Sequence, residues 1–103
     1  KILALQQRMH DVRLRDHSQV FNTARIEALE LENMMDVAVA TMLSARQREE
    51  SRGAHSRIDF PERDDVNWLR HSLYHKASNS VDYKPVRMKP LTVDSFPPKP
   101  RSY

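Results

Sequence analysis

The residues whose types could do chemistry are concentrated between Arg48 and Asp65. This segment sets one histidine among many carboxylates and guanidinium groups: Glu49, Glu50, Arg52, His55, Arg57, Asp59, Glu62, Arg63, Asp64 and Asp65. A histidine in such surroundings can act as a general acid or base near neutral pH. No nucleophile with a neighbouring base and an orienting group accompanies it. We therefore favour an ion-pair and hydrogen-bond network that holds the loop in shape.

Metal binding is the second chemical possibility for this region, with His55, Asp59 and His71 as candidate ligands. The sequence has no cysteine and no His-x-x-x-His pair on an expected helix, so this possibility is weak. It has a single glycine, Gly53, and therefore no dinucleotide fingerprint and no glycine-rich phosphate loop. We expect no catalytic residue, no metal and no bound cofactor in this chain.

The elements that position this loop begin with two helices. Residues 1–13 are expected to be helical because Ile2, Leu5 and Met9 share one helical face. The apolar start has no capping residue, so we interpret it as the remainder of a longer helix. Residues 22–49 are expected to form a long helix, with Asn22 as its N-cap and Phe21 packing on its first turn.

The long helix carries two opposed apolar stripes. One is a seam of small and apolar side chains: Ala24, Ala28, Leu31, Met35, Ala38, Met42 and Ala45. The other contains Ile26, Leu29, Val37 and Ala40. The first helix can cover one stripe. The other must meet the C-terminal half of the chain, a second copy, or a protein segment that the chain does not contain.

The second half of the chain is expected to be less helical. Gly53 can adopt a positive φ and end the long helix, opening a charged loop over residues 50–67. A hairpin follows over residues 71–89, with strands at 71–75 and 81–89. Residues 90–103 form an extended proline-rich tail. Trp68 is expected to anchor the loop to the long helix, or else to serve as an interface hot spot.

Composition supports a small, mainly α domain: a short helical bundle, a two-stranded hairpin and an extended tail. The 103 residues are 39% hydrophobic and 30% charged, so only a modest core can form. The net charge of +3 comes from the last twenty residues, which hold five basic residues and one acid. This basic tail is either solvated or bound to an anionic partner. No apolar run reaches the ~20 residues of a membrane span.

Two long and unusual motifs resemble a known family. They are Glu-Ser-Arg-Gly-Ala-His-Ser-Arg at residues 50–57 and Asp-Asp-Val-Asn-Trp-Leu at residues 64–69. With the Phe-Pro-Pro-Lys run at residues 96–99, they are similar to the C-terminal segment of the succinate dehydrogenase and fumarate reductase flavoprotein subunits. The resemblance extends from about residue 21 to residue 103, and the ending favours succinate dehydrogenase.

The resemblance implies a structural role within a larger oxidoreductase. In this family, FAD is bound by an N-terminal flavin domain, and a capping domain closes over the dicarboxylate. The implied partners are these two domains of the same subunit and the iron-sulfur subunit, which receives the electrons from succinate. The implied location is the cytoplasmic face of the bacterial inner membrane, or the mitochondrial matrix side. The motif residues Arg52, His55 and Arg57, with Trp68, are the candidates for the domain interface.

Two alternatives remain open from the sequence alone. The chain could be an independent helical interaction module that forms a homo-oligomer through the exposed stripe of its long helix. It could also be a small nucleic-acid-binding protein that uses the basic tail, although the tail lacks the interleaved aromatic residues typical of such proteins. Concentration-dependent helicity favours the first alternative, and steeply salt-dependent oligonucleotide binding the second.

Overall fold

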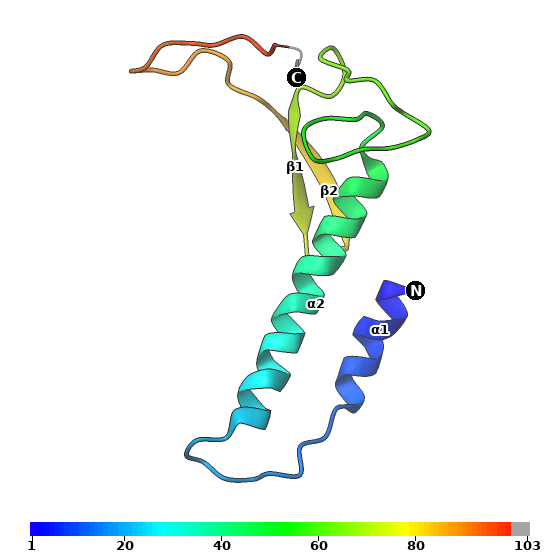
Figure 1. Ribbon diagram of the computed structural model, residues 1–103, viewed down its shortest axis with the longest axis vertical. Helices are drawn as coiled ribbons and strands as arrows, with labels where there is room; N and C mark the ends of the chain where they lie inside the picture. The colour runs from blue at the N-terminus through cyan, green and yellow to red at the C-terminus, as the bar shows by residue number, and fades with distance from the viewer. Residues whose placement is uncertain (100–103) are drawn as a thin grey trace.

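The computed structural model describes residues 1–99 and combines helices with one β hairpin (Figure 1). In chain order the elements are α1 (Ile2–Arg8), the 3-10 turn η1 (Met9–Asp11), α2 (Thr23–Gln47), β1 (Arg70–His75) and β2 (Ser80–Pro85). Helix α1 lies beside the N-terminal half of α2, and the hairpin lies beside its C-terminal half. The predicted combination of helices and hairpin is confirmed. The predicted tail falls partly outside the described residues.

Helix α2 begins as its sequence predicts. The Asn22 side-chain oxygen accepts a hydrogen bond from the Arg25 amide at 2.9 Å, which satisfies one free donor of the first turn. The Asn22 amide group in turn donates to the Ser18 carbonyl at 2.9 Å, so the cap itself is buried. The prediction for Phe21 was wrong. Its ring is 95% exposed, because a positive φ of 54° at Phe21 turns the chain before the cap.

Helix α1 is shorter than the predicted span of residues 1–13. The α-helix ends at Arg8, one 3-10 turn follows, and Val12 is already extended. One polar cluster joins α1, α2 and the hairpin. Asp36 of α2 accepts hydrogen bonds from Gln6 of α1 at 3.2 Å and from Lys76 of the hairpin turn at 2.5 Å.

The hairpin forms where predicted but ends earlier. Arg70 pairs with Pro85 and His75 with Ser80 in an antiparallel register. Strand β2 ends at Pro85, and beyond it only one long hydrogen bond, from the Val86 amide to the Leu69 carbonyl at 3.4 Å, joins the two segments. The prediction of a strand up to residue 89 was therefore wrong. Residues 90–99 are exposed and contain no helix or strand.

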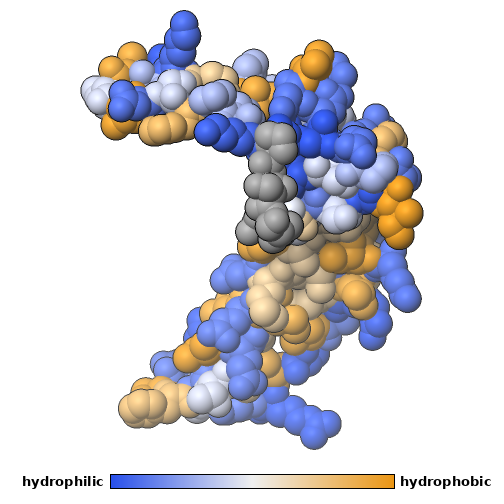
Figure 2. Space-filling model, turned by 45° about the horizontal axis from the view of Figure 1, so that its top comes forward, coloured by the Kyte–Doolittle hydropathy of each residue, from blue (hydrophilic) through white to orange (hydrophobic). Residues whose placement is uncertain are grey.

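The core is very small for a chain of this length. Val39 and Trp68 are the only buried hydrophobic side chains among residues 1–99. The radius of gyration is 19.3 Å, against about 13 Å for a compact domain of 100 residues. Figure 2 shows hydrophobic side chains spread over the surface of the lower, helical part of the molecule.

The two predicted stripes of α2 differ in how far the rest of the chain buries them. Most of the seam is half-buried under α1 and the hairpin. On the opposite stripe, Ile26 is 54%, Leu29 53% and Val37 66% exposed. The hairpin therefore does not cover this stripe. In the described part of the chain, no helix is long and apolar enough to cross a membrane.

Candidate functional site

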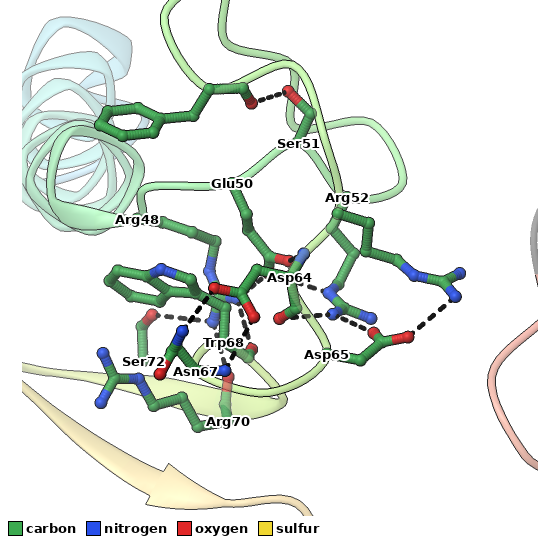
Figure 3. A network of polar contacts seen from close by, with 12 residues as sticks. Arg48, Glu50, Ser51, Arg52, Asp64, Asp65, Asn67, Trp68, Arg70 and Ser72 are labelled. Atoms are coloured by element: carbon green, nitrogen blue, oxygen red, sulfur yellow. Dashed lines mark hydrogen bonds and ion pairs between the residues drawn. The ribbon is translucent and has the colours of Figure 1, made fainter.

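The charged loop after α2 is organised around one buried carboxylate, Glu50. Its side chain has no solvent exposure. Oε1 accepts hydrogen bonds from Arg48 Nη1 at 2.5 Å and from Arg52 Nε at 2.9 Å, and Oε2 accepts from the Asp64 amide at 2.9 Å. Arg52 continues outward to Asp65 at 2.5 Å. We call Arg48, Glu50, Arg52, Asp64 and Asp65 the Glu50 network (Figure 3).

The network keeps Glu50 ionised despite its burial. Burial by itself raises the pKa of a carboxyl group, because the charged form loses its hydration. The hydrogen bonds from Arg52, from the Asp64 amide and from Arg48 outweigh this effect and lower the pKa of Glu50. A carboxylate without solvent exposure that accepts three hydrogen bonds from the domain itself is suited to a structural role.

The lowered pKa of Glu50 predicts how stability depends on pH. A group with a lower pKa in the folded state contributes stability above its unfolded pKa, here about 4.5, and loses it as the pH falls through the folded value. The difference in unfolding free energy between wild type and Glu50→Gln should be constant above about pH 5 and shrink below pH 4.5. Thermal denaturation of both proteins from pH 3.5 to 7 measures it. A difference that grows on acidification would contradict an ionised Glu50.

Trp68 lies beneath this network and joins it to the hairpin. Its side chain is only 8% exposed. The Arg48 and Arg70 guanidinium carbons lie 5.3 Å and 4.3 Å from its ring centroid, and the Tyr83 ring meets it edge-on at 5.4 Å. Arg48 also donates to the Trp68 carbonyl at 2.9 Å and to the Arg70 carbonyl at 2.6 Å. Trp68 thus joins the loop to the hairpin and to Arg48, the residue that follows α2, while its role as an interface residue remains a prediction.

Arg57 binds the end of α2. Its Nη1 donates to the carbonyls of Arg46 at 2.7 Å and Arg48 at 3.0 Å, two acceptors that the helix leaves unpaired. The guanidinium carbon lies 4.6 Å from the Phe60 ring centroid and the group pairs with Asp59. The hydrogen bond from Arg57 lowers the pKa of Asp59. Nε and both terminal nitrogens of Arg57 thus take part in holding the loop.

His55 closes a tight turn within the loop. Arg52 and His55 exchange backbone hydrogen bonds of 2.8 Å and 3.0 Å across Gly53 and Ala54. The His55 Nε2 atom is buried without a hydrogen-bond partner among residues 1–99. His71 is an exposed residue of β1, in a separate element. Within residues 1–99, no group of three or more carboxylate or imidazole side chains is placed to hold a metal ion.

Gly53 serves this turn and does not end the helix, so the prediction of a glycine helix terminus was wrong. Helix α2 already ends at Gln47, with Arg48 extended. Gly53 has a φ of +59°, the value that a two-residue turn requires at its first central position.

Gly53→Ala should lower the unfolding free energy by about 1–2 kcal/mol. A methyl group at this position meets no atom within 4 Å, so the cost arises from the backbone conformation alone. Ala54→Gly, at the neighbouring position of the same turn, is the control. Thermal denaturation of both variants checks the prediction, and equal midpoints for Gly53→Ala and wild type would contradict it.

The structure brings together most of the residues that the sequence singles out. Arg52 belongs to the Glu50 network, Trp68 lies beneath it, and Arg57 holds the preceding helix end. Three features do not follow from the sequence: the burial of Glu50, the central position of Arg48, and the stacking of Arg70. The signal in the sequence for the Arg48–Glu50 pair is an arginine two residues before a glutamate at the expected helix end. This pattern is too common to be specific.

Comparisons with known proteins agree with this arrangement of motifs. The model of the family described as fumarate reductase flavoprotein C-term matches residues 1–103. The chain is 54% identical over 101 residues to the succinate dehydrogenase flavoprotein subunit of Coxiella burnetii, covering 98% of this chain and 17% of that protein. It is 49% identical over 98 residues to the mitochondrial succinate dehydrogenase [ubiquinone] flavoprotein subunit of Oryza sativa, covering 91% and 16%.

A third relative carries the other name of the family. The chain is 45% identical over 103 residues to the fumarate reductase flavoprotein subunit of Mycobacterium tuberculosis (strain H37Rv), covering 100% of this chain and 17% of that protein. The chain thus spans about a sixth of the length of the curated relatives it matches. The match covers both motifs, the Glu50 network and the hairpin. This chain belongs to the family of C-terminal domains of fumarate reductase and succinate dehydrogenase flavoproteins.

Proposed function

We propose that this chain is the C-terminal domain of the flavoprotein subunit of a succinate dehydrogenase, and that it acts in packing and assembly. The observation that carries this proposal is the combination of an internally bonded Glu50 network with a poorly covered helix. The members of the network and Arg57 bind side chains and carbonyls of the domain itself. A domain that uses these charges internally, and whose apolar surface is open, is suited to docking.

The parent subunit would supply the chemistry. It would oxidise succinate to fumarate and pass electrons through FAD to an iron-sulfur subunit, with FAD held outside this chain. The partners of this domain would be the flavin-binding and capping domains of the same polypeptide. Its location would be the cytoplasmic face of the bacterial inner membrane or the mitochondrial matrix side. Relatives with both names support either direction of the reaction, and the 54% identical relative favours succinate dehydrogenase.

The exposed stripe of α2 is the surface that most needs a partner. Val37 of this stripe is 66% exposed, and beside it Met34 is 62% exposed. With Asn33 and the seam residue Ala38 they line a shallow, almost wholly apolar groove. Patches of this kind mark interaction sites on soluble proteins. Covering them with the flavin-binding or capping domain would supply the core that this chain lacks alone.

Complementation tests the proposal directly. The chain is co-expressed with the N-terminal part of the subunit, and the product is analysed by size-exclusion chromatography with light scattering. We expect a one-to-one complex that retains FAD and reduces a dye with succinate. A chain that elutes separately, beside an N-terminal part that is fully active alone, would contradict the proposal.

Val37→Asp should weaken this complex at least about tenfold, because it places a carboxylate in an apolar interface. The control is Arg25→Asp, a larger change of charge at an exposed position on another face of α2. Titration of one part with the other, followed by light scattering, measures both affinities. Equal weakening by the two variants would show that the stripe is not the contact.

A second candidate function rests on the same stripe. The long helix could join two copies of the chain, with Val37 at the centre of the contact. Light scattering of the chain alone distinguishes the two cases. A stable dimer that does not exchange with the N-terminal part would favour the homo-oligomer.

A further inference from the structure

Arg70 is held in place by two aromatic rings, and its guanidinium group has no acceptor among residues 1–99. Its guanidinium carbon lies 4.3 Å from the Trp68 ring centroid and 4.0 Å from that of Tyr83. Among residues 1–99 its side chain makes no hydrogen bond and no ion pair, and its Nε is buried without a partner. In Figure 3 dashed lines connect the guanidinium groups of Arg48 and Arg52 to acceptors, whereas none reaches that of Arg70.

Stacking explains the position of Arg70 but leaves its donors unused. An aromatic ring interacts with the face of a guanidinium group, while the five N–H groups point outward in its plane. A carboxylate approaching in that plane accepts two parallel hydrogen bonds. Because the rings already restrict the side chain, binding such a partner costs little further conformational entropy.

The surroundings of Arg70 also favour an anion. Arg48 lies on the same indole ring, with its charge committed to Glu50. Arg87 follows β2 at the same end of the hairpin, whereas Lys84, which pairs with His71, lies on the opposite face of the hairpin. The face that carries Arg70 therefore combines one oriented guanidinium group with Arg48, whose charge is already paired.

We propose that Arg70 binds an aspartate or glutamate carboxylate in the remainder of the same polypeptide. This inference rests on the proposed function. The curated relatives are about six times as long as this chain, so most of the acidic groups available to this surface lie outside it. The ion pair would fasten the hairpin to the rest of the subunit, at a place distinct from the exposed stripe of α2.

Zero-length cross-linking tests the proposal in the purified full-length flavoprotein subunit. Arg70→Lys keeps the positive charge and provides an amine. A carbodiimide joins this amine to a carboxylate in direct contact, with loss of water overall, and mass spectrometry of the peptides identifies both partners. We expect a cross-link from position 70 to an acidic residue preceding this chain. We also expect that adding 1 M NaCl leaves it largely intact, since a partly buried pair is weakly screened.

A second variant covers the case in which Arg70→Lys does not fold. Pro85→Lys changes an exposed residue directly opposite Arg70 in the hairpin register, so its amine reaches the same surface. Wild-type subunit, in which Lys84 and Lys89 are the nearby amines, is the control. Cross-links from the control lysines to the remainder, with none from position 70 or 85, would overturn the role of Arg70 alone. No cross-link from any lysine of this chain to the remainder would overturn the proposed function itself. A cross-link to a carboxylate of this chain, or only to another subunit, would overturn the partner assigned here.

Discussion

Glu50→Ala should destabilise the charged loop by about 3–5 kcal/mol, the cost of removing one partner from a buried ion pair. The substitution leaves Arg48 and Arg52 without their shared anion and the Asp64 amide without an acceptor. The loop should then open locally while α2 persists, because α2 has its own cap and backbone hydrogen bonds.

Hydrogen exchange followed by mass spectrometry measures this effect in the full-length subunit. The peptide that contains Asp64 should exchange at least about a hundredfold faster, as expected from 3 kcal/mol. Glu49→Ala removes the same charge from the exposed neighbouring position and should change exchange little. Equal exchange in the two variants would show that the network does not stabilise the loop.

Trp68→Ala should cost about 3–5 kcal/mol, the range for deleting a buried aromatic side chain. It removes one of only two buried hydrophobic residues in the described chain, and with it the indole ring that Arg48 and Arg70 share, while Arg70 keeps the Tyr83 ring. The hairpin should lose its attachment to the loop. Trp68→Phe keeps a ring between the guanidinium groups and should cost less.

Thermal denaturation of the subunit and exchange in the β1 peptide report this effect. Phe96→Ala is the matched control, because it deletes an aromatic side chain that is 82% exposed and should alter stability by less than about 0.5 kcal/mol. A loss below about 1 kcal/mol for Trp68→Ala would mean that the stacked arginines carry no stability.

The local elements could be predicted from the sequence because their signals are local. Asn22 caps α2 through an amide three residues away, and Asp64 accepts from the Val66 and Asn67 amides at 2.9 Å in the turn before Trp68. The turn between the strands was also found where its polar residues predict it. In each case the interacting groups lie within a few residues of each other.

The features that were missed depend on contacts between distant residues. Glu49 and Glu50 are adjacent, and the sequence does not distinguish them. Glu50 is the buried one, and it accepts a hydrogen bond from the Asp64 amide, 14 residues later. Val39 belongs to neither predicted stripe, yet it is fully buried. Two different elements cover α2 along its length, so its buried face does not follow one helical stripe. The candidate interface residues Arg52, His55 and Arg57 remain a prediction, now alongside Arg70.

The contacts of Arg48 also bear on how the domain is made. A ribosome delivers the chain from its N-terminus, so α2 and Arg48 emerge before the carbonyls of Trp68 and Arg70, which lie 20 and 22 residues later. Glu50, only two residues away, emerges almost together with the arginine. The contacts of Arg48 in the folded domain can therefore be completed only after the first strand of the hairpin has been synthesised.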